Sequence, residues 1–538
     1  MLPFPAGPMS AAAKSKLVLE QAIAALQAGD SGDAERLLRR HLLDQPRDAA
    51  ALAKLADLAI DRRNVEEATG LLRRAAAADN SLPCRLALIR HLQQFVGAQA
   101  TLSEIETLPP HFRGKFEILA IEAAARGLLG DHERQIIIYR ELTRIDPKNA
   151  ALWKTLGDAL KTIGRTDEAV AALRKAIAVR PAFGEAWWTL ANFKSFRFSD
   201  QDLRAMRKLL KGKLAPEDAL HFHFALGEAL ELRGDHAKSF EHYDAGNRIR
   251  RAGIPAAAMR VTGFVEAAID TFSPGLFERH QGSGFNSSAP IFVLGLHRSG
   301  STLIEQILAS HPSIEGTAEL TVMQLIWERL ARIAGASGRT PFQQLREMGA
   351  EDFRSIGQEY IERTSAFRTT DRPHFVDKLP ANWMNLGLIR LALPNARIID
   401  ARRHPMACGF SNFKQNYAAG VIFSYSQESI GGFYRDYVRF MDHIDEVQPG
   451  AVHRVINERL IEDPEGATRR MLEFVGVPFD QACLEFHRNM RAVQTPSAEQ
   501  VRRPINRDGI DYWRNFEPWL GPMKEALGRV LGDWDQHK

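Results

Sequence analysis

Cysteine is scarce in this sequence, and long apolar runs are missing. The three cysteines, Cys84, Cys408 and Cys483, are far apart among 538 residues, which excludes a disulfide framework and any C-x-x-C metal or redox motif. No apolar run approaches the length of a membrane span, and residues 1–10 lack the basic and apolar regions of a secretory signal. We therefore expect a cytoplasmic protein with reduced thiols, no membrane span and no metal site.

The charge balance is also unremarkable for a chain of this length. Seventy Lys and Arg residues oppose 66 Asp and Glu residues, which leaves a formal net charge of +4 and gives no support for binding nucleic acid or a membrane surface. Apolar residues make up 45% of the chain and charged residues 25%, as in ordinary globular proteins. Because 538 residues exceed what one hydrophobic core organises, two or more domains are expected.

The first half of the sequence repeats. The clearest unit starts at Ala150 and has large and small apolar residues at fixed offsets, namely Trp153, Leu156, Gly157, Leu160, Ala169, Leu173 and Ala176, with Pro181 near its end. Related units start at Ser15, Ala49, Pro83, Phe116 and Gly184, each 33 or 34 residues after the one before, and a further unit starts near Leu220. The copy from Pro83 matches poorly. The pattern resembles the tetratricopeptide repeat, in which antiparallel helix pairs stack into a solenoid that binds partners.

The second half has a different pattern. A helical connector ends in a Gly/Ser-rich linker at residues 281–290. Beyond it, apolar runs at 291–294, 375–376, 398–399 and 452–456 predict strands, and segments 320–333, 382–393 and 406–417 predict helices between them. Strands that alternate with helices indicate a parallel sheet covered on both faces. The predicted organisation is a tail (1–14), an α-solenoid (15–250), a connector (251–289) and an α/β domain (290–538).

A phosphate-binding loop is predicted between the first strand and the next helix. The spacing of Gly295, Gly300 and Thr302 matches the nucleotide-binding pattern G-x-x-x-x-G-K-[ST], but Ser301 occupies the lysine position. Backbone N–H groups at such a helix N-terminus hold an anion, whereas the lysine reaches the β- and γ-phosphates of a nucleoside triphosphate. The loop therefore favours a nucleotide with a single 5′-phosphate over ATP.

Two further segments carry groups that suit a phosphate. A predicted strand ends in Arg402 and Arg403, and the helix that follows His404-Pro405 carries Ser411. A guanidinium group matches a phosphate dianion, and the end of a parallel strand faces the ligand crevice of the sheet. The second segment, residues 500–505, forms a basic cluster that includes Arg503.

Together the three segments resemble the sulfotransferases that use 3′-phosphoadenosine 5′-phosphosulfate (PAPS). The similarity is greatest to bacterial proteins that join such a domain to tetratricopeptide repeats, and to the tyrosylprotein sulfotransferases. Residues 297–303 (HRSGSTL) correspond to the family's P-R-S-G-T-T-L, Arg403-His-Pro with Ser411 to its R-D-P and following Ser, and residues 500–504 (QVRRP) to its Q-V-x-K/R-P. The resemblance covers residues 290 to the C-terminus. It implies an all-α tetratricopeptide solenoid followed by a P-loop-like α/β sulfotransferase domain with a central parallel sheet.

The resemblance also implies roles for individual residues. Those implied to bind PAPS, the co-substrate, are Arg298, Ser299, Gly300, Ser301, Thr302, Arg403, Ser411 and Arg503. Arg298 is implied to contact the transferring sulfuryl group, Lys378 to neutralise its charge, and Glu319 to act as the base. Preorganised cations stabilise the charge of such a transfer, and a carboxylate can take the proton of a hydroxyl acceptor, so no metal is required. Glu315 and His311 are alternative bases.

The expected function is transfer of a sulfuryl group from PAPS to a hydroxyl acceptor. Peptide or protein tyrosine is one candidate acceptor, and the repeats are expected to bind the acceptor or a partner. Two alternatives stay open. A P-loop kinase is disfavoured by Ser301 and by the lack of a convincing Mg²⁺-binding acid, for which Asp400 is the one candidate. The other is a repeat scaffold whose C-terminal domain binds a nucleotide without turnover.

Overall fold

The computed structural model describes residues 11–193, 196–417, 420–489, 491 and 500–534, and their side chains except those of 11–14 and Gln500. Most of the predicted tail, 1–14, lies outside these residues. The chain forms two compact units that divide between Pro181 and Ala182. Within the described residues, no helix combines the length and the apolar character needed to cross a membrane.

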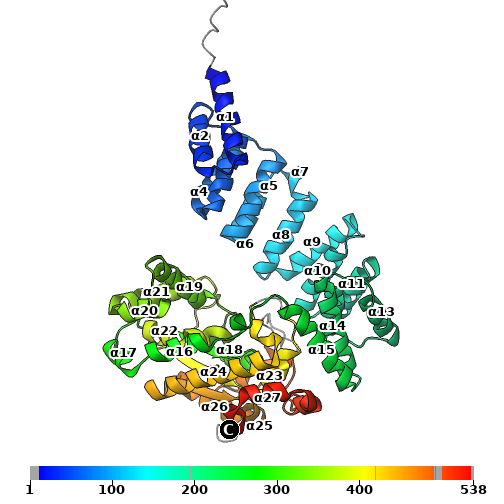
Figure 1. Ribbon diagram of the computed structural model, residues 1–538, viewed down its shortest axis with the longest axis vertical. Helices are drawn as coiled ribbons and strands as arrows, with labels where there is room; N and C mark the ends of the chain where they lie inside the picture. Colours follow the sequence, from blue (N-terminus) through cyan, green and yellow to red (C-terminus); the bar gives the residue numbers. More distant parts are fainter. Residues whose placement is uncertain (1–10, 194–195, 418–419, 490, 492–499, 535–538) are drawn as a thin grey trace, which may run out of the picture. The chain divides into compact units, whose positions relative to one another are not determined.

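Unit 1, which ends at Pro181, is a succession of antiparallel helix pairs (Figure 1). Its helices are α1 (Ala11–Gln27), α2 (Ser31–Asp44), α3 (Ala49–Asp61), α4 (Val65–Ala78), α5 (Leu82–His91), the π-helix η1 (Leu92–Val96), α6 (Ala98–Glu106), α7 (Pro110–Arg113), α8 (Phe116–Leu128), α9 (His132–Ile145), α10 (Ala150–Thr162) and α11 (Thr166–Val179). Helices begin at Ala49, Phe116 and Ala150, the residues at which the sequence pattern starts. The predicted period of paired helices is therefore confirmed.

The turn inside four of the helix pairs of unit 1 has the same left-handed conformation. Gly29, Gly130 and Gly164 have φ angles of 79°, 80° and 79°, and Arg63 takes the same place with a φ of 59°. The next residue often caps the second helix, as Asp30 does by accepting a hydrogen bond from the backbone N–H of Asp33. A left-handed residue followed by a cap reverses the chain within a few residues and so brings the two helices together.

Small residues set the spacing within a pair. A Cβ atom added at Gly157 of α10 would lie 2.8 Å from Cγ of Leu173 on α11, so this glycine lets the two helices approach. The core of this helix pair contains the buried side chains of Leu156, Leu160 and Leu173. In the poorly matching copy from Pro83, α5 runs into η1 and its partner α6 is short, so the weak sequence signal accompanies a distorted pair.

Unit 2 begins with further helices. These are α12 (Gly184–Ala191), α13 (Asp200–Leu210), α14 (Pro216–Glu231), α15 (His236–Arg251), η2 (Ala256–Met259), α16 (Thr262–Thr271) and α17 (Pro274–Arg279). They pack against the α/β part that follows. Asn247 of α15 donates a hydrogen bond to the backbone oxygen of Phe413 at 2.7 Å, and Thr262 of α16 donates one to Asp436 at 2.5 Å. The last predicted repeats therefore share a compact unit with the α/β part.

The α/β part contains a five-stranded parallel sheet with the strand order β2-β3-β1-β4-β5. Its strands are β1 (Pro290–Gly295), β2 (Ile314–Gly316), β3 (His374–Lys378), β4 (Arg397–Arg402) and β5 (Val452–Ile456). Four of them lie at predicted runs, and β2 was not predicted. The sheet confirms the predicted parallel α/β architecture.

Helices separate and flank the strands. They are α18 (Ser301–Ala309), α19 (Val322–Ala336), α20 (Pro341–Glu347), α21 (Ala350–Ser365), η3 (Pro380–Asn385), α22 (Leu386–Ala392), α23 (Pro405–Phe413), η4 (Ile422–Tyr425), α24 (Gln427–Val447), α25 (Asn457–Glu462), α26 (Pro464–Val475), η5 (Gln481–Cys483), η6 (Phe486–Arg488), η7 (Gln500–Arg502), η8 (Tyr512–Trp519), α27 (Gly521–Leu527) and α28 (Arg529–Gly532).

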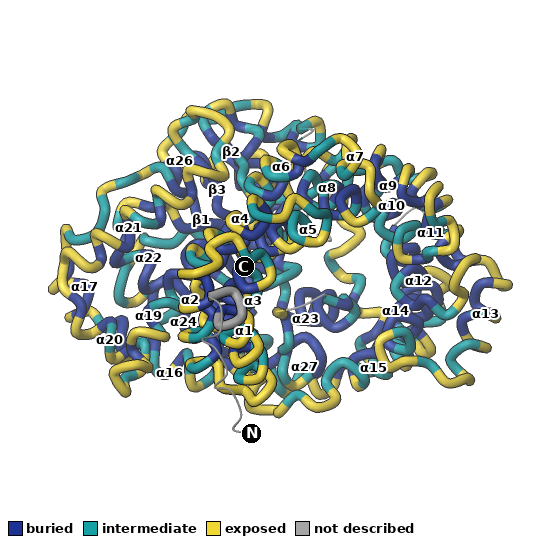
Figure 2. Tube along the Cα trace, turned by 90° about the horizontal axis from the view of Figure 1, so that it is seen from above, coloured by how far each residue is buried: buried dark blue, intermediate teal, exposed yellow. Residues whose placement is uncertain are grey.

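The sheet is covered on both faces, and β1 is buried along its whole length (Figure 2). Ile291 and Val293 of β1 share a core with Ile304 of α18 and Met471 of α26. Phe292 points to the other face, where its ring centroid lies 5.3 Å from that of Tyr360 on α21. This alternation along a strand follows from the period of two in extended backbone.

Candidate functional site

The predicted site residues follow the carboxyl ends of the parallel strands. Glu319 comes soon after β2, Lys378 ends β3, and Arg403 and Asn457 directly follow β4 and β5. The loop 296–300 follows β1 in the same way. Because all strands run parallel, these ends share one edge of the sheet, which is where open α/β sheets bind ligands.

The loop after β1 is shaped to present backbone N–H groups. Arg298 has a φ of 68° and Gly300 a φ of 98°, and positive φ angles are uncommon for residues other than glycine. A Cβ atom at position 300 would lie 2.5 Å from Oδ1 of Asn457, so a larger residue does not fit there. Helix α18 then starts at Ser301 without a side-chain cap, which leaves its N-terminus suited to an anion.

A pocket joins this loop to the two basic segments. Its lining includes Arg298, Gly300, Ser301, Thr302, Arg403, Asn457 and Arg503. Of the residues implied to bind the nucleotide, Ser411 lines an adjoining pocket that shares Arg298, Arg403 and Arg503. Ser299 lines neither pocket. It is buried in the turn, and its hydroxyl has no hydrogen-bond partner among the described residues.

Arg298, Arg403 and Ser411 are in direct contact. Nε of Arg298 donates a hydrogen bond to Oγ of Ser411 at 2.9 Å, and Nη1 of Arg403 donates one to the backbone oxygen of Arg298 at 3.3 Å. Nε of Arg403 is buried without a partner in the described chain. Burial lowers the pKa of Arg403, and the positive charge of Arg298 lowers it further. Two guanidinium groups held this close favour an anion between them.

Arg402, the last residue of β4, and Arg403, which follows it, have different surroundings. Arg402 is 1% exposed, and its Nε donates a hydrogen bond to Asp400 at 2.8 Å. Asp400 is 0% exposed and also accepts hydrogen bonds from Tyr437 and Arg454. Arg402 therefore belongs to the core and Arg403 to the pocket. Asp400, the one acid considered for Mg²⁺, is occupied by these partners.

Lys378 and Glu319 form an ion pair. The Lys378 side chain is 2% exposed, whereas the Glu319 side chain is 46% exposed, so the carboxylate is the member of the pair that solvent or an acceptor can reach. Behind Lys378 lies Glu305 of α18, with an N–O distance of 3.9 Å. Burial raises the pKa of Glu305, and Arg491, paired with it at 2.5 Å, opposes that effect. The ammonium group of Lys378 is thus held between two carboxylates.

His297 directly precedes Arg298 in the loop after β1, and its ring packs near those of Tyr417 and Phe423. Burial lowers its pKa to about 4; Glu319 opposes the shift, and Lys378 and Arg298 add to it. Of the three residues implied to be catalytic, Lys378 and Glu319 are in direct contact, whereas the guanidinium group of Arg298 contacts Ser411. His297 was not predicted as a site residue, although it directly precedes Arg298.

The two alternative bases are bound within the protein. Nε2 of His311 contacts the backbone oxygen of Pro478 at 2.9 Å, and Nδ1 accepts a hydrogen bond from the backbone of Ser313. Glu315 is buried and accepts hydrogen bonds from the backbone of Thr369 at 2.6 Å and of Thr370 at 3.1 Å. Both residues stabilise the loops around β2, which leaves Glu319 as the accessible carboxylate.

Sequence reasoning also missed Glu305 and Arg491. Glu305 lies four residues after Ser301, one turn further along α18, and this spacing could have placed it on the face that starts at the loop. For Arg491 the sequence offers no signal, because its partner is far away along the chain. No cluster of three or more His, Cys, Asp or Glu side chains that could hold a metal ion occurs in the described part of the chain.

Comparison with protein-family models agrees with this geometry. Residues 290–481 match the model of the sulfotransferase family, which spans β1 to β5 and the helices between them. Residues 290–481 form a domain of the sulfotransferase family. Residues 19–83 and 150–193 match models of the tetratricopeptide repeat. The chain therefore carries tetratricopeptide repeats and a sulfotransferase domain.

Two relatives show how far the similarity extends. A protein of Aquifex aeolicus (strain VF5), described only as uncharacterized, is 30% identical over 397 residues, which cover 72% of this chain and 52% of the relative. The chain thus spans about half the length of that protein. A putative protein-tyrosine sulfotransferase of Caenorhabditis briggsae is 26% identical over 230 residues, 41% of this chain and 80% of the relative.

Among solved structures, the sulfotransferase domain from the curacin biosynthetic pathway is similar to this chain. It is 18% identical with a TM-score of 0.34, and the match covers 47% of this chain and 98% of that domain. The sulfotransferase domain of the Synechococcus PCC 7002 olefin synthase is 25% identical with a TM-score of 0.32, over 43% and 88% of the two chains.

Proposed function

We propose that this protein transfers a sulfuryl group from PAPS to a hydroxyl acceptor. The observation that carries the proposal is the contact between the loop after β1 and the basic segment after β4, made by Arg298, Arg403 and Ser411. A nucleotide with anionic groups at both its 5′ and 3′ positions needs two neighbouring anion sites of this kind. A nucleotide with a single phosphate does not.

The residues present fit PAPS as the co-substrate. The N-terminus of α18, with Gly300, Ser301 and Thr302, would hold the 5′-phosphosulfate through backbone N–H groups and hydroxyls. Arg403, Ser411 and Arg503 would hold the 3′-phosphate. Ser301 in place of the nucleotide-binding lysine fits a donor without β- and γ-phosphates.

The transfer needs a proton acceptor and a cation at the reacting group. Glu319 takes the proton of the acceptor hydroxyl. The oxygen of that hydroxyl bonds to sulfur, and the bond from sulfur to the 5′-phosphate oxygen breaks. The products are a sulfate ester and adenosine 3′,5′-bisphosphate. Lys378 and Arg298 stabilise the negative charge that spreads over the sulfuryl oxygens and the departing phosphate.

For the acceptor we propose a tyrosine hydroxyl of a peptide or protein, presented by the repeats. Relatives named as protein-tyrosine sulfotransferases support this choice, and solenoids of helix pairs commonly bind peptides and proteins.

Ligand binding tests the donor site. The unfolding temperature of the whole protein is measured with adenosine 3′,5′-bisphosphate, with ADP plus Mg²⁺, and alone. We expect the bisphosphate to raise it, since a ligand that binds only the native state stabilises it, and Arg403→Met to remove the effect. Arg469→Met, an exposed arginine of α26, is the matched control. A preference for ADP with Mg²⁺ would favour a kinase instead.

Sulfate transfer tests the chemistry. Labelled PAPS is incubated with tyrosine-containing proteins and the enzyme, and Glu319→Gln is expected to lower the rate by about 10²- to 10⁴-fold. Glu328→Gln, an exposed residue of α19, is expected to behave like the wild type. Equal rates for Glu319→Gln and the wild type would exclude Glu319 as the base. No transfer by the wild type, despite bisphosphate binding, would favour a scaffold.

A further inference from the structure

Helix α14, the first helix of the last pair in the repeat region, forms a wall of the pocket that Ser411 lines. The pocket that contains Arg298, Arg403 and Ser411 is also lined by Glu228 and Glu231 of α14, and by Lys414. All of these residues belong to unit 2. Glu228 and Glu231 are three residues apart on α14 and share one face, and Lys414 follows Ser411 at the same spacing at the end of α23.

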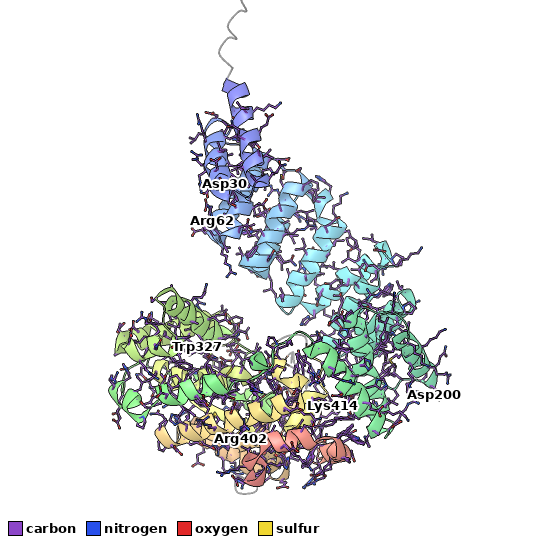
Figure 3. All side chains as sticks on the ribbon, viewed as in Figure 1. Asp30, Arg62, Asp200, Trp327, Arg402 and Lys414 are labelled. Atoms are coloured by element: carbon purple, nitrogen blue, oxygen red, sulfur yellow. The ribbon has the colours of Figure 1, made fainter. Side chains whose placement is uncertain are left out.

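Lys414 is held by the two glutamates. It forms an ion pair with Glu231, and its ammonium nitrogen lies 3.9 Å from Glu228. The hydroxyl oxygen of Tyr243 on α15 lies 3.0 Å from a carboxylate oxygen of Glu228 and 2.8 Å from one of Glu231, so the two glutamates share its single hydrogen-bond donor. Burial alone would lower the pKa of Lys414, but the two carboxylates outweigh it and the pKa is raised. Lys414 (Figure 3) therefore stays charged inside the pocket.

Burying these charged side chains costs free energy of hydration, which indicates that the charge of Lys414 has a function. The side chains of Glu231 and Glu228 are 4% and 9% exposed, and a buried ion pair contributes little net stability because both charges lose hydration. The ammonium group has three N–H donors, and its hydrogen bond to Glu231 uses one of them. Lys414 lines the pocket together with Arg298, Arg403 and Ser411, and Arg298 contacts Ser411. A pocket that gathers cations around a hydroxyl group favours a dianion.

We propose that Lys414 is a further ligand of the nucleotide's 3′-phosphate, and that Glu228 and Glu231 of the last repeat are positioning residues that hold it there. The inference rests on the proposed function of the site. It makes the end of the repeat region a component of the nucleotide site, so that α14 and the sulfotransferase domain bind the donor together.

Two nucleotides that differ only at the 3′ position test the proposal. Dissociation constants of adenosine 3′,5′-bisphosphate and adenosine 5′-monophosphate are measured by calorimetry with the whole protein. Lys414→Met is expected to weaken binding of the bisphosphate by about 10- to 100-fold, as for a lost hydrogen bond to a charged group, and to leave binding of the monophosphate within about twofold. Lys414→Arg is expected to retain most of the affinity.

The positioning role has its own test. Glu231→Gln is expected to weaken bisphosphate binding severalfold in the wild type but not in the Lys414→Met background, because the carboxylate acts through the ammonium group. Glu241→Gln on α15, an exposed glutamate, is the control. If Lys414→Met unfolds the protein, Lys414→Gln takes its place in the same comparison.

The possible results distinguish the proposed role of Lys414 from the proposed function of the site. Equal weakening of both nucleotides by Lys414→Met, or no weakening of either, overturns the role of Lys414 while wild-type binding of the bisphosphate still supports the donor site. A wild type that does not prefer the bisphosphate to the monophosphate contradicts the proposed function itself.

Discussion

At the scale of single residues, Asp377 shows how one buried group can make stability depend on pH. It is 0% exposed and directly precedes Lys378. Burial raises its pKa to about 7, although Tyr360 donates a hydrogen bond to it at 2.8 Å and the backbone N–H of Leu320 donates another. Leu320 follows Glu319, so Asp377 links the strand that carries Lys378 to the loop that carries the proposed base.

The raised pKa of Asp377 determines the direction in which stability changes with pH. Between about pH 4 and pH 7 the folded protein keeps a proton on Asp377 that the unfolded chain has released, so the free energy of unfolding falls as the pH rises through this window. Asp377→Asn cannot ionise and is expected to flatten the decline, as seen in unfolding temperatures measured from pH 4 to pH 8. The exposed Asp371→Asn is the control. An unchanged slope in Asp377→Asn would show that Asp377 is ionised throughout.

At the scale of elements, the turns inside the helix pairs share one backbone conformation with different residues. Gly29, Gly130 and Gly164 adopt it without strain, whereas Arg63 adopts it with a side chain. Arg63→Gly is therefore expected to raise the free energy of unfolding of the first unit by roughly 0.5–1 kcal/mol, as measured by urea denaturation.

The neighbouring arginine provides the contrast for that experiment. Arg62 has a φ of −82° and pairs with Glu35, so Arg62→Gly is expected to destabilise the same turn. If both substitutions destabilise, the left-handed conformation of Arg63 carries no strain.

At the scale of the whole molecule, the contacts of helices α12–α17 decide which fragments of the chain can fold independently. Phe240 of α15 stacks on Phe413 and Trp519, with ring centroids 5.6 and 5.9 Å apart. Phe272, 1% exposed, packs on Phe342 and Phe440. These contacts cover apolar surface of the sulfotransferase domain with residues that precede its first strand.

Two fragments test this dependence. Residues 182–538 are expected to fold, unfold cooperatively and bind adenosine 3′,5′-bisphosphate. Residues 290–538 are expected to aggregate, because the surface under Phe240 and Phe272 becomes exposed. Cooperative thermal unfolding of both fragments at equal temperatures would contradict this view and make the connecting helices dispensable.

Much of the fold could be predicted because its signals are local. The repeat period was visible at Ala150 and its copies, and four strands were visible as apolar, β-branched runs. Strand β2 has three residues, Ile314–Gly316, which is too short for any periodicity to indicate a strand. The loop 295–302 was recognisable since its glycines and hydroxyls are consecutive in sequence. Lys414 and Arg491 were missed because their partners, Glu231 and Glu305, lie far away along the chain.

The amino-acid sequence by itself determined the repeats, the parallel α/β domain and the chemical types in the loop 295–302, because each depends on residues within one element or turn. The tertiary structure alone decided that Arg402 is buried against Asp400, that Glu319 is accessible while Glu315 and His311 are occupied, and that Lys414 contacts Glu231. The physical reason is that strand order and helix docking set these distances, and they join residues that are far apart along the chain.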